Sequence, residues 1–464
     1  FHVWTVGCQM NIADSQRVDV GLKRLGLDEE KNIEEADIIV LNTCVVRQSA
    51  EDTATGLLGK LAKQKRKKST YICVTGCMVE STTKSLAQRF PHVDLWAKPQ
   101  DTPKIIENIA DYLNLSSDGC VENLIPEKSK FAEFVPIVQG CDKFCTFCVI
   151  PYRRGRETSK PTNQLFEEIK TLVENGTKEV TLLGQNVDSY GHDLNPKKDL
   201  SDLMYLINDI TDLKRIRFLT SHPNDMSLRL IRTINDLPKV CRSINLPFQA
   251  GSNRILANMR RGYTRDQFLR KIDQIKTIVP EATITTDLIV GFPGETEKDF
   301  EDSLDILNRV KFDKVHVAAY SERKGTFAFR QIDDDIPMEE KRIRLNTVNQ
   351  LQDKIQKKLN SKYLNKELST DDNILLNKMK SLRLDIAKQG RLPAYTVFHD
   401  STLIQMSQNK PTNEIDMLEI DGVGPTKFKN KRCINQISKR KVGKYLRNLG
   451  FRIRRIGSRF FTVS

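Results

Sequence analysis

The most informative stretch is Cys141-Asp-Lys-Phe-Cys145-Thr-Phe-Cys148, which carries three cysteines on one short loop. Thiolates are the preferred protein ligands of iron–sulfur clusters. Three of them can hold three irons of a [4Fe–4S] cluster and leave the fourth iron open. A structural zinc site is the main alternative, but zinc usually takes four protein ligands. Since no matching fourth ligand lies nearby in the sequence, the spacing favours an iron–sulfur cluster.

The cluster loop follows the first of six short apolar runs that predict β-strands. These runs are FVPIVQG, EVTLLGQN, RIRFLTS, SINLPFQ, TITTDLIVGFP and KVHVAAYS. Helical stretches such as 164–175 and 264–278 separate them. This alternation predicts a partial or open (β/α) barrel of six units over residues 132–363.

The sequence before the barrel predicts a separate α/β domain over residues 1–118. Its apolar runs FHVWTVG, ADIIVLNT and TYICVTG alternate with helical stretches at 14–25 and 51–67. Strand–helix alternation indicates a parallel sheet covered by helices. Each run is followed at once by a cysteine: Cys8, Cys44 and Cys77. Because parallel strands end at one edge of a sheet, we expect these cysteines to converge.

The stretch GCDKFCTFCVIPYRRGRETSKP resembles the radical S-adenosylmethionine (SAM) methylthiotransferases, and the resemblance extends over about residues 1–363. Gly7-Cys-Gln-Met-Asn11 followed by Ala13-Asp-Ser15 is most similar to the MiaB-type tRNA methylthiotransferases. The resemblance implies that Cys141, Cys145 and Cys148 hold a [4Fe–4S] cluster whose open iron binds SAM. It also implies that Cys8, Cys44 and Cys77 hold a second [4Fe–4S] cluster that takes part in sulfur delivery.

Further segments at predicted strand ends resemble places where family members contact SAM or substrate. They include GQNV at 184–187, FQAGS at 248–252, RGY at 261–263 and the DLIVGFPG loop at 287–294. The resemblance makes contact candidates of Gln185, Asn186, Gln249, Ser252, Arg261 and Asp287. The alternative for each is backbone support and turn formation, and both interpretations stay open. No catalytic residue beyond the cluster ligands is predicted.

Four cysteines have no motif around them: Cys73, Cys120, Cys241 and Cys433. Free cysteine commonly behaves as a small buried hydrophobe, and we expect that here. His222 lies at a predicted strand end, where a lone histidine more often holds structure than catalyses.

The net charge of +14 is concentrated at the end of the chain. Residues 431–464 contain eleven Lys or Arg and no Asp or Glu. This tail is either a phosphate-binding segment or a solvated basic end. No apolar run of 18 residues and no signal-peptide pattern are present, so we expect a cytoplasmic protein without a membrane partner. Patterned cysteines in a reducing compartment favour metal ligation over disulfides.

The resemblance to the methylthiotransferases ends at about residue 364. Family members normally end in a small β-barrel TRAM domain that binds RNA, and no such run of short strands follows here. Residues 370–430 instead resemble an HRDC domain, a helical module that binds nucleic acid weakly. The basic tail at 431–464 stays unassigned.

The resemblance implies a transferase that inserts a methylthio group at C2 of an N6-isopentenylated adenosine next to the anticodon of tRNA. The implied partners are the tRNA and a reducing protein such as flavodoxin or ferredoxin. One alternative keeps the chemistry but acts on a ribosomal protein or on a threonylcarbamoyl-adenosine in tRNA. Another is a nucleic-acid-binding fusion whose catalytic part is inert.

Overall fold

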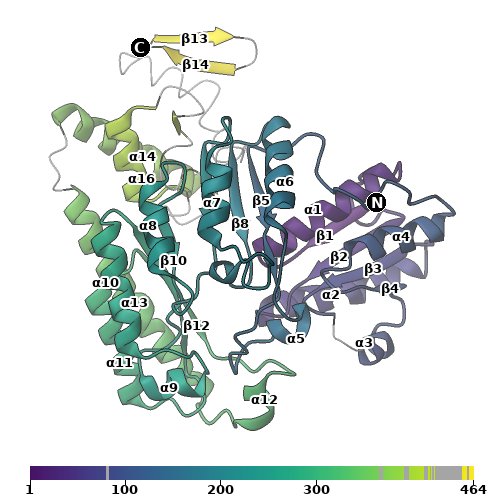
Figure 1. Cartoon of the computed structure of the whole chain (residues 1–464), viewed down its shortest axis with the longest axis horizontal. Coiled ribbons are helices and arrows are strands. Elements are labelled where there is room, and N and C mark those ends of the chain that lie inside the picture. The colour runs from purple at the N-terminus through teal and green to yellow at the C-terminus, as the bar shows by residue number, and fades with distance from the viewer. Residues whose placement is uncertain are drawn as a thin grey trace. The chain divides into compact units, whose positions relative to one another are not determined.

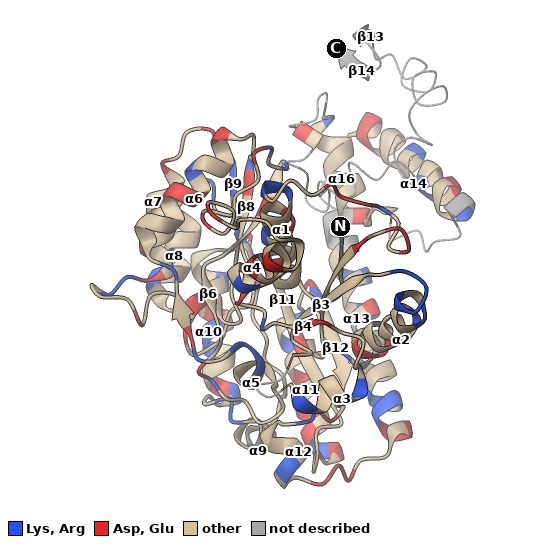
Figure 2. Cartoon of the chain, turned by 90° about the vertical axis from the view of Figure 1, so that its right-hand side faces the viewer, with Lys and Arg blue, Asp and Glu red and all other residues tan. Residues whose placement is uncertain are grey.

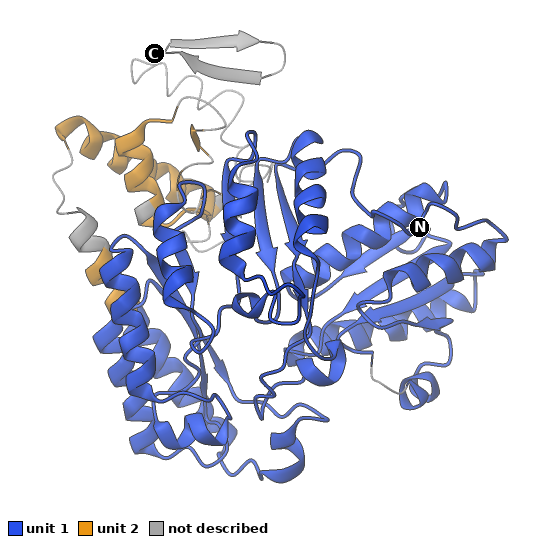
Figure 3. Cartoon of the chain, in the orientation of Figure 1, with its two compact units in different colours: residues 1–352 blue, residues 353–464 orange. Residues whose placement is uncertain are grey.

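The computed structural model describes residues 1–79, 83–364, 369–390, 397–411, 416–417, 420, 423, 452–456 and 459–463. The chain divides into two compact units, residues 1–352 and residues 353–464 (Figure 3). The predicted α/β fold, with a parallel sheet first and a helical region last, is confirmed.

A four-stranded parallel sheet begins unit 1, with the strand order β1-β2-β3-β4 (Figure 1). Its strands are β1 (His2–Thr5), β2 (Ile38–Thr43), β3 (Tyr71–Gly76) and β4 (Leu95–Trp96). Its helices are α1 (Gln9–Arg24), α2 (Gln48–Lys65), α3 (Lys84–Arg89) and α4 (Thr102–Leu113). The first three strands match the predicted runs. The sequence pattern missed β4 because two residues are too few to show an alternation.

Helices cover both faces of this sheet. On one face, Leu22 of α1 and Ile106 of α4 pack with Val40 of β2. On the other face, Leu58 of α2 packs with Ile39. This two-sided burial explains why the central strands are continuous apolar runs instead of alternating ones.

The second part of unit 1 contains the six predicted strands of the barrel. Three form a parallel sheet in the order β5-β8-β9, and three form another in the order β10-β11-β12. A parallel bridge between Ile216 and Val240 lies where the first sheet meets the chain that leads to β10. The six strands are β5 (Ala132–Pro136), β8 (Glu179–Leu183), β9 (Arg215–Phe218), β10 (Ser243–Asn245), β11 (Thr283–Val290) and β12 (Lys314–Ala319). Two short antiparallel strands, β6 (Val138–Gln139) and β7 (Thr158–Ser159), flank the cluster loop.

The longer helices of this part lie along these strands, and the short ones lie near one end of them (Figure 1). They are α5 (Ile150–Arg154), α6 (Thr162–Glu174), the 3-10 turn η1 (Val187–Ser189), α7 (Leu200–Asn208), α8 (Leu228–Asp236), α9 (Asn253–Asn258), α10 (Arg265–Ile278), α11 (Glu297–Val310), α12 (Phe327–Gln331) and α13 (Met338–Leu364). Strand β11 buries every second residue, which is the pattern of a strand with one face toward the helices.

The described part of unit 2 contains α14 (Thr370–Gly390), α16 (Asp400–Asn409) and an antiparallel hairpin of β13 (Arg452–Ile456) and β14 (Arg459–Val463). Helices α14 and α16 contact each other. Cys433 lies outside the described residues. Across the described residues, no helix has the combined length and apolarity that a membrane span requires.

Gly76 allows a close approach between the ends of β2 and β3. Its φ is +95°, and a Cβ atom there would lie 2.2 Å from the carbonyl oxygen of Thr43. Only a glycine fits this combination of positive φ and backbone contact.

We predict that G76A lowers the free energy of unfolding by about 1–3 kcal/mol, because a strained backbone conformation costs that much. The measurement is chemical denaturation followed by circular dichroism. Gly56 provides a matched control: it lies in α2 with open space where a Cβ would point. G56A should stabilise the protein by about 0.5–1 kcal/mol. Equal effects of the two substitutions would contradict the packing argument.

Candidate cluster sites

The cluster loop lies between β6 and α5 and brings three thiols together. All three cysteines are free, and Cys145 lies close enough to Cys141 and Cys148 for its charge to act on both. Burial raises the pKa of the Cys141 thiol to about 11 and that of Cys148 to about 12. Such thiols ionise only when a cation binds them, which is what iron does. The donor set therefore fits a [4Fe–4S] cluster.

Two other segments fix the middle of this loop. The backbone N–H of Thr146 donates to the carbonyl of Met259 at 3.1 Å, and its carbonyl accepts from the N–H of Ala328 at 2.8 Å. The cluster loop is therefore held between the end of α9 and the start of α12.

Arg261 supports the cluster loop from the barrel side. It is buried, and its Nη1 donates to Cys145 Sγ at 3.3 Å. Its other donors reach the Tyr263 hydroxyl at 3.2 Å and the Pro247 carbonyl at 3.2 Å. A donor aimed at a ligating sulfur orients the ligand and stabilises its thiolate.

Three of the predicted contact residues have an unpartnered amide oxygen. Gln185, Asn186 and Gln249 each bury this oxygen without a hydrogen-bond partner among the described residues. Buried polar atoms are normally paired, so such an atom needs an explanation such as a missing ligand. Gln249 also has a φ of +65°, and its backbone N–H donates to the Asp287 carbonyl at 3.0 Å. Each of the three oxygens is therefore available to accept a hydrogen bond from a polar ligand.

The remaining contact candidates already have protein partners. At the start of α9, the Ser252 hydroxyl donates to the carboxylate of Asp299 in α11. Asp287 accepts from Asn245 Nδ2 at 3.1 Å. Arg261 holds Cys145 as described above. These contacts give Ser252 and Arg261 a supporting geometry.

His222 and Asn186 belong to a polar network beneath the cluster loop. Asp225 accepts from Asn186 Nδ2 at 2.6 Å and from Lys143 Nζ at 2.8 Å. Lys143 is part of the cluster loop, so the network anchors that loop. The N–H of His222 donates to Asp188 at 3.1 Å, and burial lowers the pKa of the imidazole to about 2. A neutral, buried histidine fits the structural role expected for it.

The second cysteine set lies at the carboxyl edge of the N-terminal sheet. The N–H of Cys77 donates to the Thr43 carbonyl at 2.9 Å, which joins the ends of β2 and β3. A Cβ atom at Gly7 would lie 2.8 Å from Cβ of Cys44, so the loop after β1 touches the loop after β2. The structure therefore brings the loops of Cys8, Cys44 and Cys77 together, as the strand ends predict.

Asn11 fastens these loops to one another. Its Nδ2 donates to the Val6 carbonyl at 3.0 Å and to the Thr43 carbonyl at 2.9 Å. Its Oδ1 accepts a weak bond from Cys8 Sγ at 3.5 Å. One buried side chain thus connects the loops after β1 and β2.

Arg154 is a site residue that the sequence analysis missed. It belongs to α5, six residues after Cys148, but its side chain enters the N-terminal domain. Its Nη2 donates to Asp14 at 2.8 Å and to Asn11 Oδ1 at 3.1 Å. Its Nε and Nη1 are buried without a hydrogen-bond partner among the described residues. Arg154 also lowers the pKa of the Cys77 thiol, which burial raises to about 11.

Apolar contacts also join the two cysteine sets. Val149 and Ile150, which follow Cys148, pack in one hydrophobic cluster with Val45 and Cys77. The clusters predicted for the two loops therefore have neighbouring sites within unit 1.

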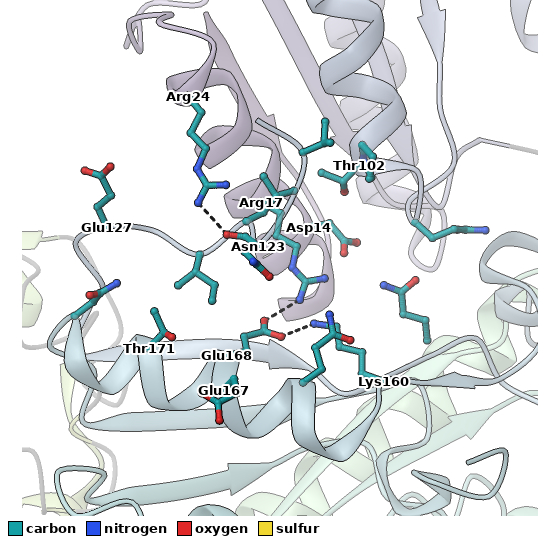
Figure 4. A pocket seen from close by; sticks show the side chains of 18 of the residues that line it. Asp14, Arg17, Arg24, Thr102, Asn123, Glu127, Lys160, Glu167, Glu168 and Thr171 are labelled. Atoms are coloured by element: carbon teal, nitrogen blue, oxygen red, sulfur yellow. Dashed lines mark hydrogen bonds and ion pairs between the residues drawn. The ribbon is translucent and has the colours of Figure 1, made fainter. Parts of the chain in front are cut away.

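A polar cavity of about 660 Å³ lies beside the Asp14 end of this contact (Figure 4). Within it, Glu168 accepts from Arg17 at 3.1 Å and from Lys160 at 2.7 Å. The Arg17–Glu168 pair connects α1 to α6. The lining carries four carboxylates and three cationic side chains, so the cavity does not form an anion site.

Across the described residues, no group of three His, Cys, Asp or Glu side chains converges on a single metal ion. A [4Fe–4S] cluster does not need such a group, because each thiolate binds a different iron. Three free thiols on converging loops, with the buried Arg154 guanidinium acting on Cys77, fit a cluster at the N-terminal edge.

Sequence profiles of known families match three parts of the chain. The Radical SAM superfamily matches residues 135–307, the uncharacterized protein family UPF0004 matches residues 1–98, and the HRDC domain matches residues 372–437.

Curated relatives match most of unit 1. A protein of Dehalococcoides mccartyi named tRNA-2-methylthio-N(6)-dimethylallyladenosine synthase is 43% identical over 362 residues, which are 78% of this chain and 84% of the relative. Proteins of the same name from Dictyoglomus thermophilum and Thermotoga petrophila are 44% and 40% identical and are covered to 83% and 84%. The chain belongs to the MiaB-type radical SAM methylthiotransferases. Membership of this family implies an enzyme that uses a [4Fe–4S] cluster and SAM.

Among solved structures, the radical SAM methyltransferase TsrM from Kitasatospora setae, with cobalamin and a [4Fe–4S] cluster bound, matches with a TM-score of 0.51. The match covers 68% of this chain and 74% of TsrM at 12% identity. At that identity the likeness concerns the fold alone.

We predict that R154M lowers the free energy of unfolding by about 3–5 kcal/mol, because it leaves Asp14 buried without its cation. Only 1% of the Arg154 side chain and 4% of the Asp14 side chain are exposed. The matched control is R229M, which breaks the exposed pairs of Arg229 with Asp199 and Asp202. That substitution should cost at most about 1 kcal/mol. Urea denaturation of both variants measures the difference, and equal losses would refute the assigned burial of the pair.

Proposed function

We propose that this methylthiotransferase acts on tRNA and inserts a methylthio group at C2 of an N6-isopentenylated adenosine next to the anticodon. The observation that carries the proposal is the pair of neighbouring cysteine sets, one on the barrel loop and one at the N-terminal sheet edge. The shared name of the relatives, at 40–44% identity over most of their length, supports the choice of nucleoside.

Two [4Fe–4S] clusters are part of the proposal. Cys141, Cys145 and Cys148 would hold the cluster that binds SAM, and the other set, Cys8, Cys44 and Cys77, would hold the auxiliary cluster. When bound, the first group supplies the electron that cleaves SAM to a 5′-deoxyadenosyl radical, and the second takes part in sulfur delivery. A reducing partner such as flavodoxin or ferredoxin would supply electrons from outside the chain.

In the same proposal, each cluster belongs to a separate domain. We assign residues 1–118 to the auxiliary cluster and residues 132–363 to SAM and the radical cluster. Residues 370–430 form the HRDC-like module, and residues 431–464 are the basic tail. The HRDC profile match and the helices α14 and α16 support the third assignment.

Among the contact candidates, the amide oxygens of Gln185, Asn186 and Gln249 are free to accept hydrogen bonds from SAM or the nucleoside. Ser252 and Arg261 act as positioning residues in this proposal, because Ser252 already hydrogen-bonds Asp299 and Arg261 already hydrogen-bonds Cys145. Asp287 keeps both interpretations, contact and support, because its carboxylate accepts a hydrogen bond from Asn245.

Iron analysis tests the two-cluster assignment. Two [4Fe–4S] clusters give about eight iron and eight sulfide per chain after anaerobic reconstitution. Alanine at Cys8, Cys44 and Cys77 together should lower this to about four of each. C241A is the matched control, because Cys241 lies outside both sets, and it should keep about eight. Unchanged iron in the triple variant would remove the auxiliary cluster from the proposal.

Nucleoside analysis tests the reaction and its substrate. Cells that express the chain should contain the 2-methylthio derivative of N6-isopentenyladenosine in their tRNA, and cells without it should contain only the unmodified precursor. Mass spectrometry of digested tRNA measures both. A mass increase on a threonylcarbamoyl-adenosine or on a ribosomal protein would support the alternative substrates. If SAM yields no 5′-deoxyadenosine under reducing conditions, the catalytic part is inert.

A further inference from the structure

Exposed arginines, one exposed tyrosine and two half-buried phenylalanines surround the cluster loop and have no role in the chemistry proposed above. We name this surface the aromatic–arginine rim, and it consists of Phe144, Tyr152, Arg156, Arg260, Phe327 and Arg330. They come from the cluster loop and from the segments around α5, α9 and α12. Figure 2 shows these three helices at the same end of unit 1, with lysine and arginine beside them.

Four rim residues form a continuous row. The Arg156 guanidinium lies 5.6 Å from the centre of the Phe144 ring, and the Arg330 guanidinium lies 5.7 Å from that of Tyr152. The Phe144 and Tyr152 rings meet edge to face at 6.2 Å. Tyr152 is 38% exposed and the Arg156 side chain is 74% exposed. The row therefore presents the Tyr152 ring and exposed cations at the surface, beside the ligand loop.

The third pair joins the segments after α9 and at the start of α12. The Arg260 guanidinium lies 3.9 Å from the centre of the Phe327 ring. Met259 and Ala328 hold Thr146 by backbone hydrogen bonds. Arg260 follows Met259 and Phe327 precedes Ala328 in the sequence, so the pair lies next to both of these bonds. The rim is thus fixed to the cluster loop by hydrogen bonds of the main chain.

Among the described residues, two of the three rim cations have no counter-ion. Neither Arg260 nor Arg330 pairs with a carboxylate among the described residues, although Arg330 Nε donates to the Thr326 carbonyl at 3.3 Å. Arg156 differs, because it binds Asp142 at 2.6 Å. An exposed cation that is stacked on a ring and lacks a carboxylate is ready to bind an anion that also has a flat face.

We propose that the aromatic–arginine rim binds the unpaired nucleotides of an RNA loop and presents one base to the cluster site. A nucleotide has both a π-face for Tyr152 and Phe327 and a phosphate for Arg260 and Arg330. An acidic peptide would satisfy the charges but leave the rings without a partner, so the observations favour RNA. The inference rests on the proposed function for its choice of a loop next to an anticodon.

The test measures binding of the full chain to a hairpin RNA that carries N6-isopentenyladenosine in its loop, by fluorescence anisotropy over a range of salt concentrations. The double variant R260Q/R330Q should bind about tenfold or more weakly. Its salt slope should fall by about 0.7 for each phosphate that the variant no longer neutralises, the value for single strands. Y152L should weaken binding about fivefold or more and leave the salt slope unchanged, because stacking is not ionic.

Matched controls lie outside the rim. Arg309 of α11 has a side chain that is 58% exposed, and Tyr205 of α7 is 43% exposed. R309Q and Y205L should keep the wild-type Kd and salt slope. Circular dichroism and iron content of every variant check folding independently of RNA.

Binding and turnover separate the two proposals. Weaker RNA binding by the rim variants supports the rim even if the wild-type chain forms no methylthio product, in which case the proposed function fails alone. Wild-type affinity and salt slope in R260Q/R330Q and in Y152L overturn the rim even if the wild-type enzyme modifies tRNA. Equal losses in the control variants, or a wild-type chain that binds no hairpin RNA, also overturn it.

Discussion

The buried ion pair between Arg154 and Asp14 is the interaction on which the arrangement of unit 1 depends. Arg154 belongs to the helix that ends the cluster loop, and Asp14 belongs to the first helix of the N-terminal domain. A buried charge is costly without a partner, so neither residue is stable in its place when the domains separate. Burial raises the pKa of Asp14 and Arg154 opposes that rise, which reflects the same coupling. The pair therefore selects the one docking of the domains in which the two cysteine sets are neighbours.

This docking suits the proposed reaction, which would need both sites at once. In that proposal a radical formed at one site would act on a carbon that also receives sulfur at the other, and proximity would make this a local step. Val149 and Cys77 pack in one hydrophobic cluster, so apolar contacts join the two loops.

The sequence predicted what depends on neighbouring residues and missed what depends on distant ones. The convergence of the Cys8, Cys44 and Cys77 loops could be predicted because Cys44 and Cys77 directly follow β2 and β3, Cys8 lies three residues after β1, and parallel strands end at one edge. Arg154 stands in the stretch that carries the family resemblance, yet its partner lies 140 positions earlier, and no spacing shows such a pair. The same limit applies to Arg261, predicted as a possible SAM contact. Its bond to Cys145 spans 116 positions and is visible only in the folded chain.

The rim offers a physical reason why a methylthiotransferase can have a different C-terminal module. If stacking beside the cluster loop chooses the base, then the choice is made entirely within residues 1–352, by side chains such as Tyr152 and Arg260. An appended module then needs only to add phosphate contacts. Such contacts do not depend on the nucleotide sequence, and each adds to the slope of RNA affinity against salt concentration. A helical HRDC domain can meet that requirement as well as a β-barrel. Exchange of the module should therefore alter the affinity for RNA while the modified position stays the same, because separate surfaces control the two properties.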